Sequence, residues 1–361
     1  MHSTYLRQLH SHGAFLGTAV GESLGLARQG LTRQSAIRYY GPDPLRYQLL
    51  PGFGIYGENT KLGFLFIQSL LNSRNDFDGL KQAFRWRLSW YPLSLSCNLS
   101  NSTLRAGARS WLMRFGLRSG TKSTDSAFAS RAIYSGVVMQ GTGHRLLNWA
   151  EEATRLTHHS EIATNCARVY CTLSSFACMR PKAFEPLEAL ELACNYTTDS
   201  ELKEKLQQLV PFLSAKRGPR AVAKHFGWRT KIPAHCVATT VMATYCFLRF
   251  PKDFEKAVSS AVLLGGETAV LGASVGGLVG AHIGNERLPE NLTSALRGYP
   301  HGLPWMERLA SRVAQWPHGA DDLAIAPALS SAPLLQVASN ILLWPASLYH
   351  GSRRWIARVQ S

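Results

Sequence analysis

The chain has 361 residues, of which 45% are hydrophobic and 17% are charged, so it can bury a large core as ordinary globular proteins do. It contains no low-complexity stretch, acidic tail or internal repeat, which excludes a string of linked modules and predicts one domain over residues 1–361. Two polar segments, 116–126 and 216–233, are interpreted as loops between helices.

Lysine and arginine number 39 against 23 acidic residues, which gives a formal net charge of +16. A surplus of this size favours anionic partners such as nucleotides, phosphorylated ligands, nucleic acids or membrane surfaces. Some of the basic residues flank tryptophan, and that combination can stack on bases and contact phosphates. The local concentrations are 85–87, 114–118, 216–220 and 353–358. Because they are scattered, we interpret them as solvated faces and do not expect nucleic-acid binding.

Several features bear on where the protein works. Residues 1–5 do not start the pattern of a secretory signal, which is a charged region followed by an apolar stretch and a cleavage site. The apolar run 258–283 is rich in small residues and is interrupted by Glu267, so it predicts a buried helix instead of a membrane span. The seven cysteines include no Cys-x-x-Cys pair, and we expect reduced, buried thiols. These features predict a cytoplasmic protein that does not bind a membrane.

Hydrophobic periodicity is helical along almost the whole chain, beginning with a glycine-rich first segment. Stripes with a spacing of 3.6 residues cover 62–70, 84–91, 162–179, 187–196 and 236–250. Asp253 follows Pro251 and is expected to begin a further helix, with acidic residues in its first turn. Runs of strict alternation are short and isolated. The expected class is an all-α protein, a compact bundle of about a dozen helices.

Two of the expected helices carry glycine at every fourth position. The glycines are Gly13, Gly17, Gly21 and Gly25 in the first helix and Gly272, Gly276, Gly280 and Gly284 in the second. This spacing leaves one face of each helix bare enough for another backbone to approach closely. Glu22 is set among the glycines of the first helix, and Glu267 opens the second. The pattern predicts a tightly packed helical centre with a polar site built into it.

Four short blocks follow one another along the chain and carry a resemblance. Residues 13–25 read GAFLGTAVGESLG, 57–60 read GENT, 157–158 read TH and 265–270 read GGETAV. In this order they resemble the G-x-x-x-G-x-A-x-G-D-A-L-G, T-D-D-T, T-H and G-G-D-T-D-T motifs of the ADP-ribosylglycohydrolase (dinitrogenase reductase-activating glycohydrolase-like) family. Because the blocks span nearly the whole chain, the resemblance implies the multi-helix fold of that family.

The resemblance also implies a chemistry. The family holds two Mg²⁺ ions with the threonine and aspartates of the second motif and with the aspartates and final threonine of the fourth. Such hard cations take oxygen ligands at about 2.1 Å in near-octahedral geometry. The ions would orient the ribose hydroxyls and a water for attack at the anomeric carbon of ADP-ribose. The bond cleaved is an N- or O-glycosidic link to a protein side chain or small molecule.

The chain departs from these motifs at every implied metal ligand. Glutamate replaces aspartate at Glu58 and Glu267, which displaces the carboxylate oxygens by roughly 1.5 Å. Asn59 keeps one neutral oxygen. Side-chain oxygens are lost altogether at Gly57, Ala269 and Val270. The loss of anionic oxygens weakens the attraction for two dications, so we expect at most one weakly bound Mg²⁺, held by Glu58, Asn59 and Glu267.

The surviving carboxylates have a second interpretation, as buried acids paired with an arginine. Arg131 is one such partner, because it aligns with the arginine of the family's G-N-G-x-x-M-R segment. Here that segment, 125–131, contains no glycine, and Phe128 is expected to fill space that adenosine would occupy. Gln29 stands where many members have an acid, and an amide can hydrogen-bond a ligand but cannot exchange a proton.

The candidate site residues follow from these matches. A carboxylate pair in a partly dry cleft can divide into an acid and a base. The candidate catalytic residues are therefore Glu22, Glu58 and Glu267. The candidate ligand-binding residues are Gln29, Asn59, Arg131, His158 and Thr268. For His158 we favour a structural hydrogen bond in the core over catalysis.

Three functions stay open on the sequence alone. The favoured one is an ADP-ribosylglycohydrolase-like protein that has lost efficient two-metal hydrolysis and binds a nucleotide-like or other anionic ligand in its cleft. The second is an active divergent hydrolase that uses Glu22, Glu58 and Glu267 with one metal or none. The third is a non-catalytic structural partner of another protein.

Overall fold

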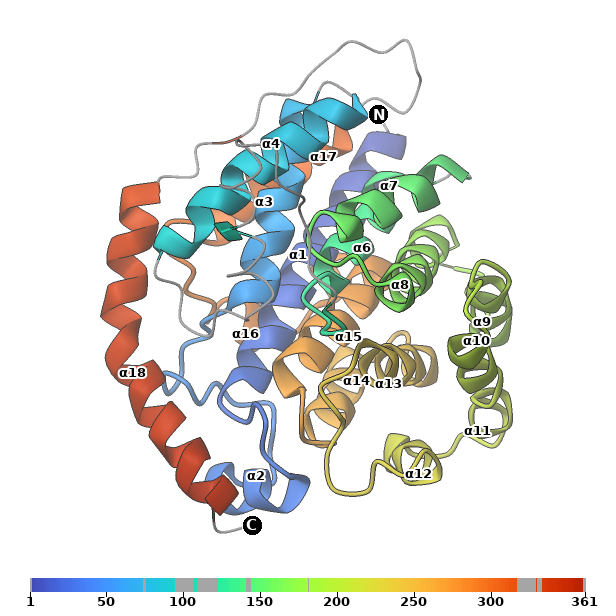
Figure 1. Ribbon diagram of the computed structural model, residues 1–361, viewed down its shortest axis with the longest axis vertical. Helices are drawn as coiled ribbons and strands as arrows, with labels where there is room; N and C mark the ends of the chain where they lie inside the picture. The colour runs from blue at the N-terminus through green and yellow to red at the C-terminus, as the bar shows by residue number, and fades with distance from the viewer. Residues whose placement is uncertain are drawn as a thin grey trace.

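The computed structural model describes residues 2–73, 76–94, 107–108, 123–140, 144–180, 182–316, 329 and 333–359. These residues form helices joined by turns and loops (Figure 1). They contain three isolated β-bridges and no β-strand. The all-α class expected from the periodicity is confirmed. Among the described helices, none has both the length and the apolar character needed to cross a bilayer.

The helices are, in chain order, α1 (His2–Leu26), α2 (Arg33–Tyr40), α3 (Glu58–Asn72), α4 (Phe77–Trp90), η1 (Tyr91–Ser94), α6 (Ala129–Val138), α7 (His144–Arg155), α8 (Glu161–Met179), α9 (Pro186–Asn195), α10 (Ser200–Gln207), α11 (Val210–Ser214), α12 (Pro219–His225), α13 (Cys236–Arg249), α14 (Phe254–Val262), α15 (Thr268–Ile283), η3 (Asn285–Arg287), α16 (Glu290–Thr293), α17 (Leu303–Ala314) and α18 (Pro333–Val359).

Short polar side chains begin several of these helices. Asp253 accepts a hydrogen bond from the backbone N–H of Lys256 and caps α14, where the sequence predicts a helix start. Asp76 and Asp199 cap α4 and α10 in the same way. The caps satisfy N–H groups that have no partner within the helix, which explains why the helices begin at these residues.

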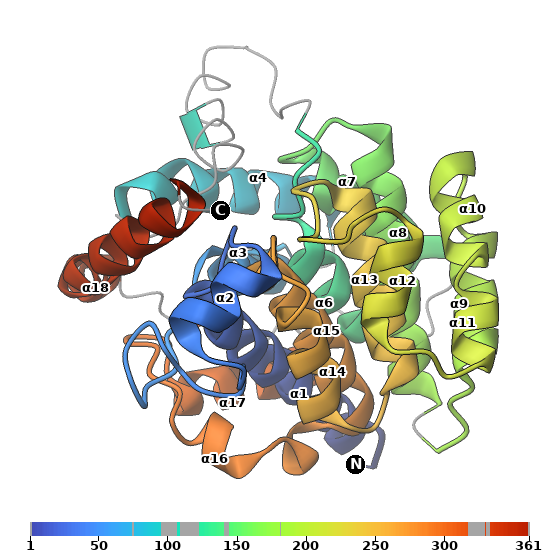
Figure 2. The ribbon, with the colours of Figure 1, turned by 90° about the horizontal axis from the view of Figure 1, so that it is seen from below.

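The centre of the molecule is the contact between α1 and α15, which lie side by side in both views (Figures 1 and 2). A Cβ atom placed on Gly17 would overlap the carbonyl oxygen of Gly276, and one on Gly276 would overlap that of Gly17. The same reciprocal contact recurs for the pairs Gly13–Gly280 and Gly21–Gly272. The two backbones therefore touch directly along several turns, as the glycine spacing predicts, and α3, α6, α8 and α13 pack around them.

Helix α18 lies along one side of the molecule (Figure 1). Its inner side is attached largely by polar contacts, among them Lys61 Nζ to Asn340 Oδ1 at 2.7 Å and Arg354 Nη1 to the carbonyl of Leu26 at 3.1 Å. Exposed apolar side chains recur along the same helix at seven-residue spacing, which places them on one face. They are Leu334, Leu335, Ile341, Leu342, Leu348, Tyr349, Trp355 and Ile356.

The structure corrects one of the two predicted loops. The segment 216–233 contains α12, which starts at Pro219 directly after Gly218. Proline at the first helical position is a start signal, because its fixed φ suits a helix and the N–H it lacks has no partner there. Of the other predicted loop, 116–126, residues 116–122 lie outside the described part, so that prediction remains open.

The cysteines within the described part are all buried and in thiol form. Burial raises the pKa of Cys171, Cys178 and Cys246, since an apolar environment disfavours the thiolate. This agrees with the expectation of reduced, buried thiols. Cys97 lies outside the described residues.

Buried histidines make the fold sensitive to acid. The ring of His282 packs on Phe184 and its Nδ1 lies 3.1 Å from the carbonyl oxygen of Ala177. Burial lowers the pKa of His282 from 6.5 to about 4, so the folded state holds this ring neutral where the unfolded chain takes up a proton. The stability that depends on the neutral ring is therefore lost as the pH falls from 6.5 towards 4.

We predict that His282→Gln reduces the acid sensitivity of the protein. The wild type should lose about 3 kcal/mol more unfolding free energy between pH 6.5 and pH 4 than the variant does. Urea denaturation at a series of pH values measures the difference. His225→Gln, at an exposed ring, is the control and should retain the wild-type slope. Identical slopes for wild type and His282→Gln would contradict the assignment.

Candidate functional site

Glu22 lies in the buried contact between α1 and the start of α3. Its Oε1 accepts hydrogen bonds from the backbone N–H and the side-chain amide of Asn59, at 3.0 and 2.8 Å. Its Oε2 accepts from the backbone N–H and the hydroxyl of Thr60, at 3.0 and 2.6 Å. The carboxylate thus binds the N-terminus of α3, whose N-cap residue Gly57 makes no side-chain cap bond. This arrangement holds Glu22 as an anchor for α3.

Glu58 and Arg131 form the charged interior next to this anchor. Both side chains are buried, with 5% and 0% of their surface exposed. Burial lowers the pKa of the Arg131 guanidinium to about 10, and the negative charges of Asp125 and Glu58 oppose that shift. The guanidinium also lies over the ring of Phe84. An internal cation therefore accompanies the carboxylate at the position where the family resemblance implies a metal ligand.

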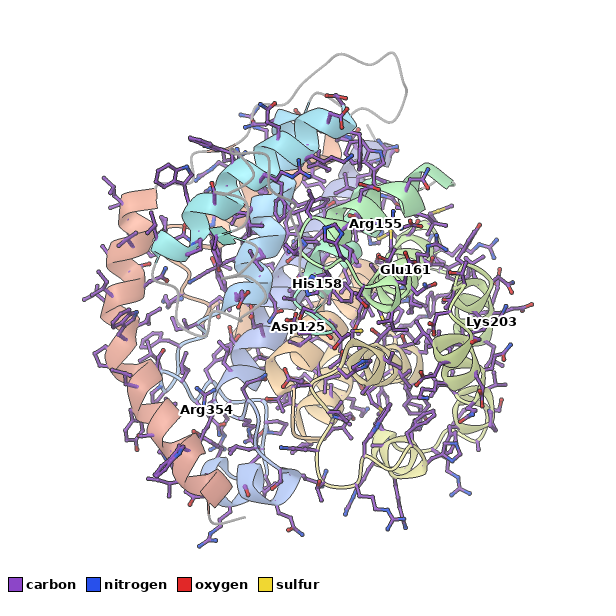
Figure 3. All side chains as sticks on the ribbon, viewed as in Figure 1. Asp125, Arg155, His158, Glu161, Lys203 and Arg354 are labelled. Carbon is purple, nitrogen blue, oxygen red and sulfur yellow. The ribbon has the colours of Figure 1, made fainter. Side chains whose placement is uncertain are left out.

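A chain of hydrogen bonds leads from Arg131 to the surface. Arg131 Nη2 donates to the hydroxyl of Thr157, which lies 2.7 Å from His158 Nδ1. His158 and Asp125 are labelled in Figure 3, and His158 Nε2 lies 2.9 Å from Asp125 Oδ1. The Asp125 side chain is about one third exposed (34%). Burial lowers the pKa of His158, although the hydrogen bond to Asp125 opposes this. The pattern suits a neutral ring that donates from Nε2 and accepts at Nδ1.

Gln29 and Glu267 form a third group, at the start of α15. Gln29 Nε2 donates to Glu267 Oε2 at 2.8 Å, and Gln29 Oε1 accepts from the backbone N–H of Ala269 at 2.8 Å. Gln29 and Glu267 are both half-buried. Thr268 is fully buried and its hydroxyl donates to the carbonyl of Gly25 at 2.7 Å. Thr268 therefore helps to join α15 to α1.

The surroundings of Ala269 show whether a metal pair fits. Ala269 is buried in an apolar cluster with Leu26 and Leu49, against which Ile55 packs. Helix α18 contacts the backbone of this cluster, because Arg354 and His350 hydrogen-bond the carbonyls of Leu26 and Leu49. Within the described ranges, no three His, Cys, Asp or Glu side chains are grouped as metal ligands would be. The residues present do not fit the two-magnesium site that the resemblance implies.

The structure brings the candidate residues into three groups. Glu22 meets Asn59, Gln29 meets Glu267, and Arg131 reaches His158 through Thr157. Asp125 belongs to the third group but was not among the sequence candidates. The alignment with G-N-G-x-x-M-R could have indicated Asp125, which is the first residue of that segment. It could not have indicated its partner, because His158 is 33 residues away in the sequence.

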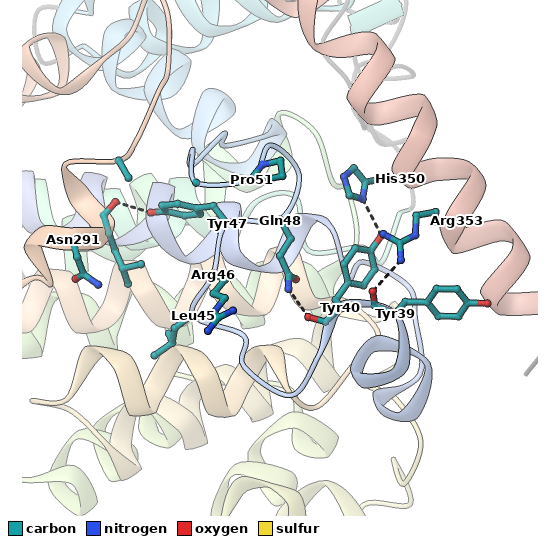
Figure 4. A pocket seen from close by; sticks show the side chains of 13 residues that line it. Tyr39, Tyr40, Leu45, Arg46, Tyr47, Gln48, Pro51, Asn291, His350 and Arg353 are labelled. Atoms are coloured by element: carbon teal, nitrogen blue, oxygen red, sulfur yellow. Dashed lines mark hydrogen bonds between the residues drawn. The ribbon is translucent and has the colours of Figure 1, made fainter.

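A cavity of about 570 Å³ lies between the loop after α2 and α18, and sequence reasoning did not find it (Figure 4). Tyr40 lies in its wall, with its hydroxyl 2.9 Å from His350 Nδ1 and its ring beneath the Arg353 guanidinium. Tyr47 donates its hydroxyl to the carbonyl of Leu292. Aromatic walls of this kind suit flat ligands, but Tyr40 ends α2 and Tyr47 lies in the loop after it, so no recognisable spacing relates them.

The comparisons with known proteins agree with this architecture. The sequence profile described as ADP-ribosylglycohydrolase matches residues 4–322. A solved structure titled "ADP-ribosylglycohydrolase-related protein complex" is similar, with 26% sequence identity, a TM-score of 0.60, and coverage of 86% of this chain and 98% of that one. A search of curated proteins found no match. The chain belongs to the ADP-ribosylglycohydrolase family and has its helical fold, which confirms the resemblance. Helix α18 lies after the matched residues in the sequence.

Proposed function

We propose that this protein is an ADP-ribosylglycohydrolase-like protein that binds a nucleotide-like or other anionic ligand in the family's cleft and does not hydrolyse ADP-ribosyl bonds through two magnesium ions. The observation that carries this proposal is the apolar cluster of Leu26, Leu49 and Ala269, with Ile55 against it. It stands where the fourth family motif has an aspartate ligand, so a dication would lack an anionic oxygen on that side.

Charge supports the anionic class of ligand. Members of the family bind ADP-ribose-like molecules, and this chain carries a net charge of +16. Within the described residues, Nε and Nη1 of the buried Arg131 have no hydrogen-bond partner. A buried guanidinium with unused donors is costly unless another group satisfies it, and a phosphate or an ordered water does so.

The remaining candidate residues take positioning roles in this proposal. Glu22 is fully occupied by the N-terminus of α3, and His158 links Thr157 to Asp125. Asn59 and Glu267 lie at the starts of α3 and α15, and Gln29, which follows α1, holds Glu267 by a hydrogen bond. The buried cysteines in thiol form support a cytoplasmic location.

A turnover assay tests the loss of hydrolysis. With ADP-ribosylated arginine and serine peptides and excess Mg²⁺, we expect no ADP-ribose release above the enzyme-free blank. An active family member serves as the positive control. Release that a chelator stops would overturn the proposal. Release that resists the chelator but is lost in Glu58→Gln would favour the active, divergent hydrolase.

Hydrogen exchange tests ligand binding separately. Added ADP-ribose should protect the backbone around 57–60, 123–131 and 264–270, with and without a chelator. The starts of α3 and α15 then mark the bound ligand directly. Unchanged exchange in all three segments at saturating ADP-ribose would contradict binding in this cleft.

Restoring an aspartate at position 269 tests whether the site can bind a metal ion. Ala269→Asp should lower the unfolding free energy by about 2–4 kcal/mol, because it buries an unpaired carboxylate among leucines. Excess Mg²⁺ should not restore the lost stability. Ala215→Asp, at an exposed position, controls for the added charge. If Mg²⁺ restores the melting temperature of Ala269→Asp, the site still binds a dication and the metal argument is wrong.

A further inference from the structure

A second cavity, of about 520 Å³, lies between the start of α2 and the segment around α12. Both helices are at the lower end of the molecule in Figure 1. The residues lining the cavity are Thr32, Arg33, Gln34, Ser35, Arg38, Arg220, Arg229 and Thr230. Four of these eight are arginines, and none is acidic. None of these lining residues is among the candidate residues grouped around Glu22, Glu267 or Arg131.

The four arginines have no anionic partner among the residues that the structure describes. Among the described residues, no carboxylate lies within ion-pair distance of any of them. Arg33 is half-buried, and its pKa is lowered first by burial and then by the positive charge of Arg220. Like charges gathered at one concave surface repel one another, so the arrangement is stabilised when an anion enters.

The cavity is also preorganised. Arg33 Nη1 donates to the carbonyl of Leu263 at 3.1 Å, and the Arg33 backbone N–H donates to Thr230 at 3.0 Å. The side chain of Thr32 caps α2, and the first turn of that helix contains no acidic residue. The positive end of the α2 dipole is therefore directed at the same cavity, where the hydroxyl of Ser35, which accepts from the Thr32 hydroxyl at 2.9 Å, is left to donate.

We propose that this arginine pocket binds a diphosphate, either free or as the diphosphate group of a small molecule. A guanidinium fork matches two phosphate oxygens, so a diphosphate offers more oxygens to four arginines than a single phosphate does. Two adjoining phosphate groups offer enough oxygens, and a cavity of about 520 Å³ leaves room for them. The inference does not depend on the function proposed for the cleft.

Titration calorimetry with inorganic pyrophosphate tests the pocket. The wild-type protein should bind one pyrophosphate, and the Arg220→Glu/Arg229→Glu double variant should bind it about 100-fold more weakly. Both substituted side chains are exposed and hold no other element in place, so the fold should be retained, as circular dichroism will check. The control is the Arg287→Glu/Arg308→Glu double variant. It makes the same change in net charge at other exposed arginines, and Arg287 follows the far end of α15. Its affinity should remain within about twofold of the wild type.

The alternative outcomes are separable. If pyrophosphate binding is weakened equally in the two double variants, its affinity depends only on the net charge of the protein, and the proposed site is wrong. Failure of the wild type to bind pyrophosphate would overturn it as well. Tight binding of a short oligonucleotide with no binding of pyrophosphate would replace the diphosphate with a nucleic acid. Loss of ADP-ribose protection at 57–60 in the Arg220→Glu/Arg229→Glu variant would count against the cleft proposal, while the arginine pocket would stand.

Discussion

Gly276→Leu is expected to yield no stably folded protein. A Cβ atom at this position would overlap the carbonyl oxygen and carbon of Gly17, and both belong to backbone that cannot turn aside as a side chain does. The substitution therefore has to move α1 away from α15, which opens the contact at the centre of the molecule. Even Gly276→Ala should cost about 3 kcal/mol or more. Thermal unfolding followed by circular dichroism measures both variants.

Gly218→Leu is the matched control for this prediction. A Cβ at Gly218 meets no atom within 4 Å, and its backbone conformation (φ −71°, ψ 148°) suits any residue. Its melting temperature should stay close to that of the wild type. A Gly276→Leu protein that unfolds at the wild-type temperature would disprove direct contact between the two backbones.

Glu22→Gln is expected to lower the unfolding free energy by about 2–4 kcal/mol. The carboxylate accepts four hydrogen bonds, two on each oxygen, from Asn59 and Thr60. An amide replaces one of these oxygens with a donor, so donors face each other and at least one buried N–H loses its partner. The negative charge near the positive end of the α3 dipole is lost too. Urea denaturation at neutral pH gives the free energy.

Glu204→Gln controls for the change from carboxylate to amide. Glu204 is an exposed residue of α10 that accepts one bond from Gln208. Its substitution should change the stability by less than about 0.5 kcal/mol. If Glu22→Gln is as stable as Glu204→Gln, the inference that Glu22 anchors α3 is wrong. If Glu22→Gln folds normally but abolishes a measured turnover, Glu22 acts in chemistry instead.

Local signals were sufficient for much of the fold. The helical stripe within 236–250 became α13, and Asp253 caps α14, because periodicity and capping act over a few neighbouring residues. The short helix α12 was missed inside a segment interpreted as a loop. Its seven residues are too few for a hydrophobic stripe, and only the Gly218-Pro219 pair indicated its start.

The candidate site was harder to predict than the fold. The motif positions of Glu58, Asn59 and Glu267 were recognisable, but the partners of these residues come from distant segments. Asn59 meets Glu22, which precedes it by 37 residues, and Glu267 meets Gln29, which precedes it by 238. Sequence patterns report which residue types are present, whereas the chain path decides which of them touch.

Sequence alone determined the helical class, the presence of two helices whose glycine faces admit another backbone, and the loss of oxygen ligands at Gly57, Ala269 and Val270. Each depends only on residue type and spacing, which are fully contained in the chain. Only the tertiary structure decided that Leu26 and Leu49 surround Ala269, that Glu22 anchors α3, and that four arginines line one cavity. These contacts join segments far apart in the sequence, and no local propensity specifies how such segments meet.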